Sequence, residues 1–253
     1  MIELWAGLIT LTATTVLTVA GVGAAFILIP IYLALGIELH TAMSTALLLN
    51  GISMVFASIT FAKEKLILWR MALPIIIAAT ILSPLGAYAS QYVPRNNLLF
   101  LFILFLLFAA SMMLFYKPGK AKKEDGAGDE SAKPTLKVGL PVGGFAGFVG
   151  GLLGVGGGNI VVPALIWLGI PPKQASATTS FIVIFSSFAG FAGRASLGSL
   201  DSILLLYTVV GSIGGALLGA WLMSKKMQNK HVKVVIGVLL YVIAAKMLFD
   251  LWR

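Results

Sequence analysis

The segment from Gly150 to Pro163 has a composition suited to holding an anion inside an apolar chain. It reads Gly-Gly-Leu-Leu-Gly-Val-Gly-Gly-Gly-Asn-Ile-Val-Val-Pro. Glycines let the backbone adopt positive dihedral angles and leave N–H groups accessible. A helix restarting near Asn159 would add the positive end of its dipole. The cluster from Gly154 to Gly158 is therefore predicted to bind an anion.

Glycines in such a chain have two other interpretations. Gly211, Gly215 and Gly219 recur at a spacing of four, which is typical of close helix packing in membranes. Packing needs that spacing and not a contiguous run, so a binding role is favoured for the cluster at 154–158. A nucleotide phosphate loop is excluded because no Lys-Ser/Thr pair follows Gly158 and no strand precedes the run.

Hydroxyl side chains begin the next apolar span in each half of the chain. Thr178, Thr179 and Ser180 lie in the second half, and Ser44 and Thr45 occupy the matching place in the first. Hydroxyls can donate to an anion without burying a charge. Taken alone, they are better explained by bonds back to carbonyls of their own helix.

Few other polar side chains fall within the apolar segments. Asn50 and Asn159 are amides that need partners when buried, and Asn159 beside the glycines is the stronger ligand candidate. Arg194 follows a span and is interpreted mainly as an anchor at the membrane interface, with anion attraction as the alternative. His40 and His231 are expected in solvated loops.

Carboxylates are expected only at membrane boundaries, which favours an anionic or neutral substrate over a metal cation. Any coupling to protons would then use the substrate, water or a group at the end of a span. No cofactor and no metal are expected. The boundary carboxylates outside the segment 117–137 are Glu3, Glu38, Glu64, Asp201 and Asp250.

Composition identifies the class of protein. Of 253 residues, 59% are hydrophobic and 11% charged, with a mean hydropathy of +1.00. Windows such as 98–116 carry no Asp, Glu, Lys or Arg and are long enough to cross a lipid bilayer as a helix. The net charge of +9 comes from lysines in loops and does not indicate nucleic acid. With no cysteine and no histidine or carboxylate pair in the spans, an intramembrane enzyme is not expected.

The sequence matches itself at an offset of 133, which aligns residues 21–58 with 154–191 without a gap. Gly21, Gly23 and Pro30 recur as Gly154, Gly156 and Pro163. The predicted organisation is a first transmembrane repeat at 1–116, a cytoplasmic polar linker at 117–137 and a second transmembrane repeat at 138–253.

Each repeat is predicted to hold one long apolar segment, at 4–37 and at 138–172, followed by three ordinary spans. As one helix a long segment would measure about 50 Å, against a bilayer core of roughly 30 Å. Glycines near the middle of both predict a reversal of the chain. The expected ordinary spans are 42–62, 66–90 and 98–116, then 175–193, 202–224 and 232–250.

The lysine and arginine distribution favours hairpins. If each long segment crosses once, the 18 basic residues divide 12 to 6 between the two sides; if each enters and returns, they divide 14 to 4. The positive-inside rule selects the second arrangement, with the linker cytoplasmic and both termini outside. An odd number of crossings per repeat then makes the repeats inverted, as in many alternating-access transporters. The predicted fold class is an all-α integral membrane bundle of two such repeats.

The run from Gly150 to Leu165, with Leu-Gly-Ile-Pro-Pro-Lys-Gln-Ala and Ala-Thr-Thr-Ser after it, resembles the TauE/SafE sulfite exporter family, also called the sulfonate uptake permeases. The resemblance extends over essentially the whole chain. It implies transport of sulfite, sulfonates or related sulfur-containing organic anions by a multi-pass protein of the cell membrane. The residues that it implies for substrate binding are Gly156, Gly157, Gly158 and Asn159, with Thr178, Thr179 and Ser180 nearby.

The first half departs from this pattern. It reads Gly21-Val-Gly-Ala-Ala-Phe-Ile-Leu-Ile-Pro30 where the family has a glycine-rich run, and Ser44-Thr45-Ala46 replaces the fuller hydroxyl set. We therefore expect the second half to contribute most of the binding, with Gly21, Gly23, Ser44, Thr45 and Asn50 as secondary candidates. The leading hypothesis is a secondary carrier that binds the anion at the glycine-broken helix ends between the two repeats and works by alternating access; a channel, or a membrane subunit that binds a partner through the linker, is the alternative. The particular anion, the direction of transport and the oligomeric state stay open.

Overall fold

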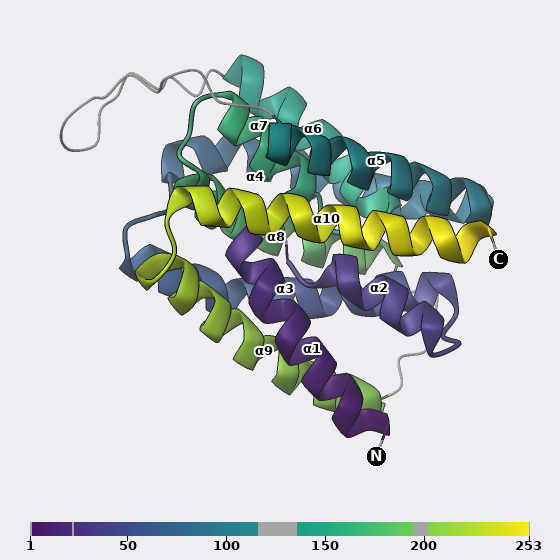
Figure 1. Ribbon diagram of the computed structural model, residues 1–253. Coiled ribbons are helices and arrows are strands. Elements are labelled where there is room, and N and C mark those ends of the chain that lie inside the picture. The colour runs from purple at the N-terminus through teal and green to yellow at the C-terminus, as the bar shows by residue number, and fades with distance from the viewer. Residues whose placement is uncertain (1, 22, 116–135, 195–201, 253) are drawn as a thin grey trace.

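The computed structural model describes residues 2–21, 23–115, 136–194 and 202–252, and within them the chain forms ten α-helices, one 3₁₀ turn and no strand. The all-α prediction is confirmed for this part of the chain (Figure 1). The predicted linker, at 117–137, lies almost wholly outside the described residues. The helices are α1 (Ile2–Ala20), α2 (Ala25–Ala34), α3 (Leu39–Lys63), α4 (Trp69–Ala89), α5 (Arg95–Phe115), α6 (Leu136–Leu152), α7 (Gly158–Trp167), α8 (Pro172–Arg194), α9 (Ser202–Lys225) and α10 (Asn229–Trp252), with η1 (Ser90–Tyr92) after α4.

Among the described residues, four helical stretches are long and apolar enough to cross a membrane: α3, α4 continued through η1 to Tyr92, α8, and α9 from Leu205. They correspond to four of the six ordinary spans expected from the sequence. The other two expected spans, 98–116 and 232–250, coincide closely with α5 and α10. A multi-pass membrane protein follows from these apolar helices.

Neither long apolar segment forms a single helix. The first is divided between α1 and α2, and the second between α6 and α7. Gly21 and Gly23 have φ angles of 70° and 85° in the first break, and Gly154, Gly156 and Gly157 have 71°, 75° and 77° in the second. Residues with a Cβ atom disfavour this left-handed region, whereas glycine adopts it readily. The helices therefore end where these glycines occur.

The boundaries of the short helix after each break recur at a fixed offset in the two halves of the chain. Helix α7 begins and ends 133 positions after α2 begins and ends. The same offset relates the positive φ angles of Gly21 and Gly154, of Gly23 and Gly156, and of Gly36 and Gly169. Backbone conformation thus follows the periodicity seen in the sequence.

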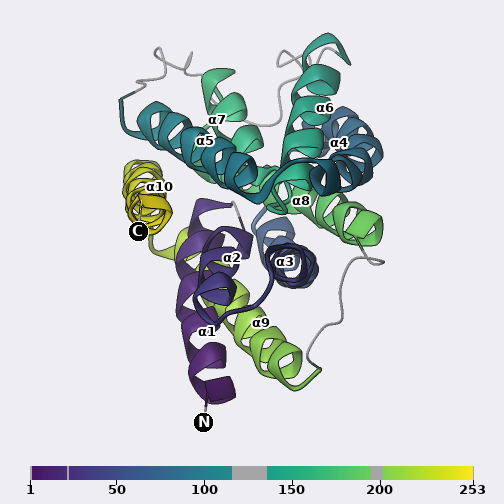
Figure 2. The ribbon, with the colours of Figure 1, turned by 90° about the vertical axis from the view of Figure 1, so that its right-hand side faces the viewer.

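The two halves of the chain are interleaved in space. The broadest helix contacts are those of α6 with α4 and of α1 with α9, so the first helix of each half packs on the fourth helix of the other. Helices α3 and α8 contact each other between these two pairs (Figure 2). Helices α5 and α10 lie side by side on one flank.

Glycine spacing explains how the outer pairs come so close. A Cβ atom at Gly211, Gly215 or Gly219 would overlap a backbone carbonyl of α1, which confirms the packing role predicted for these residues. Glycines of α6 allow the same close approach to α4, because a Cβ at Gly143 or Gly147 would lie 2.5 Å from backbone atoms of α4. In lipid the hydrophobic effect does not drive helices together, so close van der Waals packing at small residues holds them in contact.

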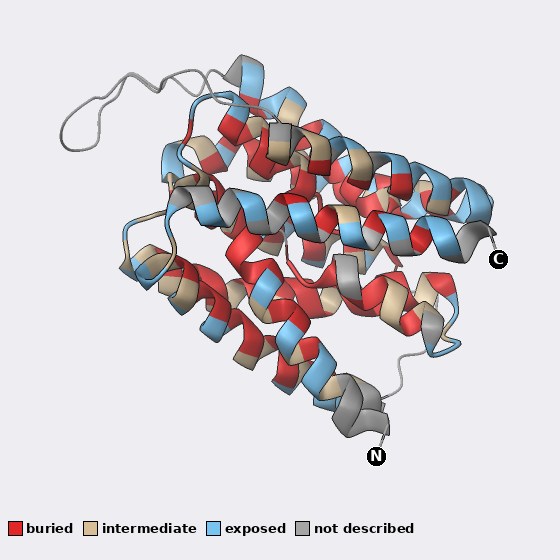
Figure 3. Cartoon of the chain, viewed as in Figure 1, coloured by how far each residue is buried: buried red, intermediate tan, exposed pale blue. Residues whose placement is uncertain are grey.

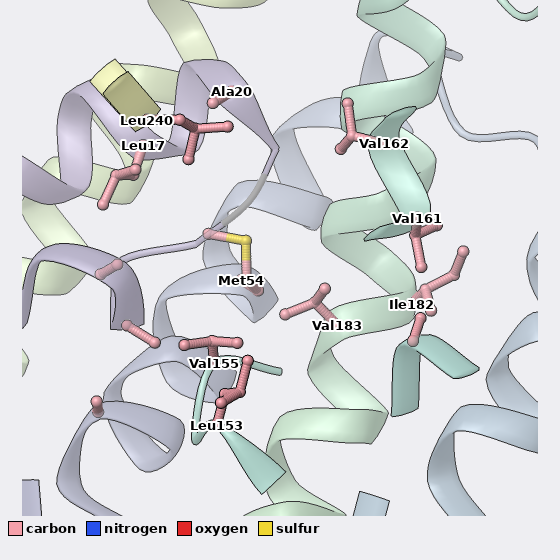
Figure 4. Close-up of a cluster of buried hydrophobic side chains, with 14 of the residues drawn as sticks. Leu17, Ala20, Met54, Leu153, Val155, Val161, Val162, Ile182, Val183 and Leu240 are labelled. Atoms are coloured by element: carbon pink, nitrogen blue, oxygen red, sulfur yellow. The ribbon is translucent and has the colours of Figure 1, made fainter. Parts of the chain in front are cut away.

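Burial follows this arrangement. The inward faces of α2, α3 and α8 are buried, whereas α5 and α10 present exposed outer faces (Figure 3). Leu153 and Val155 of the second break lie in the buried apolar cluster with Met54 and Val183 (Figure 4). Both breaks are therefore enclosed by helices and not by loops.

Several contacts tie one end of α8 and α9 to the loop between α3 and α4. The Glu64 carboxylate pairs with the Lys225 ammonium at 2.8 Å. Lys173 donates a hydrogen bond to the carbonyl of Ser224 at 3.0 Å. The backbone N–H of Leu68 donates to the Thr178 hydroxyl at 3.0 Å. The end of α3, the start of α4, the start of α8 and the end of α9 therefore lie at the same end of the bundle.

Candidate functional site

The two helix breaks approach the same pair of central helices. Gly23 of the first break packs against the amide of Asn50 on α3, where a Cβ atom would overlap Oδ1. Gly156 of the second break packs against Asn50 Nδ2 and the Ser187 hydroxyl of α8. Glycine is required at both places because φ is positive and the space is filled. Asn50, Gly23 and Gly156 were all predicted site residues, and the structure brings these three together.

Asn50 is the polar centre of this arrangement. It is fully buried, and Nδ2 donates to the Ser187 hydroxyl at 3.0 Å. Its Oδ1 has no hydrogen-bond partner among the described residues. A buried polar atom without a partner costs about 1–3 kcal/mol, so such atoms recur where a ligand or water binds.

Serines connect the second break to its neighbours. The Ser186 hydroxyl donates to the carbonyl of Gly156 at 2.7 Å, and the Ser83 hydroxyl of α4 donates to the carbonyl of Ser186 at 2.7 Å. These serines and Ser187 were not predicted as site residues. Ser186 is identical to Ser53 in the 133-residue alignment. That identity, in a serine pair within an apolar span, was the signal that could have identified them.

The start of α7 presents unpaired backbone donors. Gly157 is its N-terminal cap residue. The N–H groups of Gly157, Gly158 and Asn159 donate to no backbone carbonyl that the described chain shows. The Asn159 side chain is buried, and neither its Nδ2 nor its Oδ1 has a partner among the described residues. The positive end of the helix dipole, free amides and an unsatisfied amide side chain thus coincide.

A groove of about 850 Å³ lies between α5, α6 and α7, and Asn159 is the one polar residue among those that line it. Both polar atoms of the Asn159 side chain are themselves buried. Phe108, Phe145 and Trp167 also line the groove, each more than 60% exposed. The predicted site residues therefore fall into two places: the contact of both breaks with Asn50, and the start of α7 beside this groove.

The predicted hydroxyls are placed differently from one another. Ser44, Thr45 and Ser180 donate to carbonyls four residues earlier in their own helices, as the simpler interpretation expected. Thr178 accepts from Leu68 N–H at the start of α4. Thr179 is fully buried, and its hydroxyl has no partner among the described residues. Within the described part of the chain, none of these five hydroxyls is hydrogen-bonded to either break.

Gly21, the remaining predicted glycine, contacts α8 from the first half. A Cβ at Gly21 would lie 2.6 Å from the Ser176 Cβ, and the Ser176 hydroxyl donates to the carbonyl of Ala20 at 3.0 Å. At the matching place in the second half, a Cβ at Gly154 would lie 2.6 Å from the Met43 Cβ on α3. Each break is thus held against the central helix of the other half.

Arg194 differs from the expectation of an exposed interfacial anchor. It is fully buried, the one charged side chain so placed among the described residues. Its Nη2 donates to the carbonyls of Gly151 at 2.6 Å and Leu152 at 2.9 Å, and its Nη1 lies 3.5 Å from His40 Nδ1. These carbonyls end α6, where the helix dipole is negative and a cation is stabilised. The sequence placed Arg194 after a span but could not show that α6 ends beside it.

Among the described residues, no group of three or more His, Cys, Asp or Glu side chains is placed to hold a metal ion. The chemistry that the breaks offer is that of hydrogen-bond donors and a neutral amide. Such groups can hold an anion while it exchanges its hydration shell, without fixing it by a full opposite charge.

Comparison with known protein families identifies the class of protein. The family described as "Sulfite exporter TauE/SafE" matches residues 6–247. The chain belongs to this family. The resemblance inferred from the glycine and hydroxyl motifs is thereby confirmed, and the TauE/SafE protein described here is a membrane transporter by family.

Relatives extend this result. The chain is 29% identical to "Probable membrane transporter protein YunE" of Bacillus subtilis over 260 aligned residues, which cover 95% of each protein. It is 25% identical to "Probable membrane transporter protein YdhB" of the same organism over 85% of each. A 43-residue segment, 17% of the chain and 10% of the relative, is 54% identical to "Sulfite exporter TauE/SafE family protein 6" of Arabidopsis thaliana. No solved structure matches the chain.

Proposed function

We propose that this TauE/SafE protein is a secondary transporter of sulfite, a sulfonate or a related sulfur-containing organic anion. The observation that carries the proposal is the meeting of two glycine-broken segments on Asn50 and α8, inside a bundle of apolar helices. Positive-φ glycines, the backbone N–H groups at the start of α7 and Nδ2 of Asn159 would supply directional donors for sulfonate oxygens. The absence of a nearby carboxylate in the sequence of these segments favours an anion over a cation.

We further infer that each long segment is a hairpin and that the two repeats are inverted. A single crossing by each segment would put the end of α3 and the end of α9 on opposite sides of the membrane. Glu64 and Lys225 are 2.8 Å apart, so these ends lie together, as the hairpin arrangement requires. Arg194 and His40 support the same arrangement at the other end of α8. The linker and Lys225 would then lie in the cytoplasm, with both termini outside.

Transport by alternating access follows from this arrangement. The α1–α9 and α4–α6 pairs each join helices from both repeats, so each pair would move as a unit while α3 and α8 carry the central contacts. Rocking of one pair relative to the other would open first one break and then the other to water. The anion would be held between the breaks, and the second half would supply most of its donors.

Flux of labelled sulfite, sulfoacetate and taurine into liposomes tests the proposal, with and without a proton gradient. We expect saturable uptake of at least one sulfur anion by the purified protein. Asn159→Ala should abolish it with near-normal expression, and Gly157→Leu should abolish it while also lowering stability, because its Cβ would overlap the carbonyl of Ala146. Gly169→Leu is the matched control, since Gly169 has a φ of 88° but no atom within 4 Å of its Cβ position. Absence of flux of every sulfur anion, or unitary channel currents in place of saturable uptake, would refute the carrier.

A further inference from the structure

The groove between α5, α6 and α7 offers a ligand apolar contact and almost no hydrogen bonding. Its volume of about 850 Å³ lies within the roughly 300–1,000 Å³ typical of small-molecule sites. Twelve of its thirteen lining residues are apolar, and the exception, Asn159, has both polar side-chain atoms buried. Phe108, Phe145 and Trp167 give it broad exposed aromatic surface. The ligand that fits such a lining is a hydrocarbon chain.

The groove lies among membrane-spanning elements (Figure 2). Helix α5 coincides closely with the window 98–116, which carries no Asp, Glu, Lys or Arg. It packs broadly on α10 but only narrowly on α7, so Leu104 and Phe108 line the groove with more than half of their surface exposed. The hydrocarbon layer around these helices holds acyl chains and no water. Because empty space forfeits dispersion contacts, an acyl chain in the groove is favoured over a void.

The depth of the groove matches one leaflet of the membrane. Along α7 its lining runs from Asn159 to Trp167, a rise of about 12 Å at 1.5 Å per residue. Half of a hydrocarbon core of about 30 Å is about 15 Å. A single acyl chain that enters from one membrane surface would therefore reach the end of the groove, whereas a transmembrane helix of a partner would extend well beyond it.

Basic residues lie at the end of the bundle near Trp167. Trp167 is the last residue of α7, and α8 begins five residues later. Lys173, at the start of α8, donates to the Ser224 carbonyl at 3.0 Å, so it shares this end of the bundle with Lys225 and Lys226 of the α9 terminus. Positive charge attracts anionic phospholipids, and tryptophan is enriched at membrane surfaces. The Trp167 end of the groove therefore suits a lipid headgroup, and the Asn159 end suits the terminal methyl group.

We infer that the groove binds one acyl chain of an anionic phospholipid whose phosphate lies level with the lysines at the Trp167 end. The chain fills the space between α5 and the α6–α7 hairpin, which carries the second break. On its other side this hairpin packs on α4 through Gly143 and Gly147. The bound lipid would thus hold the second break in place and stabilise the protein, whichever anion the protein transports.

Lipid retention by the purified protein provides the test. The protein is delipidated in maltoside detergent and dioleoylphosphatidylglycerol is added back; native mass spectrometry counts the bound lipids, and thermal unfolding is recorded. We expect one retained lipid and a melting temperature raised by several degrees. Ala164→Phe places a ring in the groove and should remove both effects. Ala245→Phe, at an exposed position of α10 outside the groove, is the matched control and should keep both.

Two further measurements keep the test decisive if Ala164→Phe does not fold. Phe145→Ala removes an exposed wall residue and should weaken lipid binding about tenfold, the change expected when roughly 55 Å² of apolar contact is lost. Dioleoylphosphatidylcholine has the same acyl chains but no net charge, so it should bind more weakly than dioleoylphosphatidylglycerol.

The outcomes are distinguishable. No retained lipid in the parent protein, retention that neither groove variant weakens, or equal binding of the two lipids overturns the inference. A dimer that Ala164→Phe dissociates would place a second copy in the groove and overturns it as well. Failure of every sulfur anion to cross the liposome membrane would overturn the proposed function alone, because lipid retention does not depend on the substrate.

Discussion

Gly23 offers the sharpest test of the central contact, because the chain contains a glycine that shares its backbone strain but not its neighbours. Gly23 has a φ of 85° and Gly36 a φ of 80°. A Cβ atom at Gly23 would overlap Asn50 Oδ1, whereas nothing lies within 4 Å of the corresponding position at Gly36. Replacing each by alanine therefore separates backbone strain from steric overlap.

Backbone strain and steric overlap together set the expected loss of stability. Holding alanine in the left-handed region costs about 1–2 kcal/mol, which is the whole effect expected for Gly36→Ala. In Gly23→Ala the Asn50 amide must also move away from Ser187. Losing that buried hydrogen bond adds about 1–3 kcal/mol. Gly23→Ala should thus lower the free energy of unfolding by roughly 2–5 kcal/mol in total.

Reversible unfolding in detergent micelles, followed by circular dichroism, measures both losses, and liposome flux is recorded for the same proteins. Gly23→Ala should also reduce transport, whereas Gly36→Ala should leave it near the parent level. In the Asn50→Ala background the overlap is gone, so Gly23→Ala should cost no more than Gly36→Ala. Equal losses for the two single variants, or no relief in the Asn50→Ala background, would refute the central contact.

Three other predictions concern packing and charge. Gly215→Ala should destabilise the protein by about 1–3 kcal/mol because its Cβ would meet a carbonyl of α1. Gly214→Ala, whose Cβ would lie 3.4 Å from its nearest atom, should be neutral or stabilising by up to about 1 kcal/mol. Thermal unfolding of the two variants measures the difference. Arg194→Met should cost about 3 kcal/mol through lost hydrogen bonds to the end of α6, and hydrogen exchange of α6 should rise; unchanged exchange would contradict this role. Lys225→Ala should shift stability by less than about 1 kcal/mol, and high salt should erase even that difference, because the ion pair is largely exposed.

The helices and their interruptions were largely predictable. Apolar windows and the glycines at 21, 23 and 154–158 are local features, and helix propensity and left-handed backbone preference act locally. The packing role of Gly215 was also predictable, since a spacing of four places such glycines on one face. Arg194 was not, because its burial depends on where α6 ends, which is 42 residues earlier in the chain.

The candidate site was predicted only in part. The sequence selected Asn50, Gly23 and Gly156 and predicted that the two breaks share a site, yet no pattern indicated that they meet on Asn50 or that Ser187 joins them. Asn159 was selected beside the same glycines, but its amide is buried and makes no hydrogen bond to Asn50 or Ser187 among the described residues. A residue's type is local, whereas the direction of its side chain depends on helix rotation and on which neighbour fills the space.

Hydrophobicity and backbone preference belong to each residue and its near neighbours. The membrane class, the family, the helical elements and the glycine positions at which the long segments break could therefore be inferred without coordinates. The packing of α1 on α9 and of α6 on α4, which rests each break on a central helix of the other half, became visible only in the folded chain. Helices in lipid choose partners by close steric fit over many residues. That fit arises between segments far apart in the chain, 68 residues for Gly143 and Ile75 and 204 residues for Gly211 and Gly7, and no local pattern specifies it.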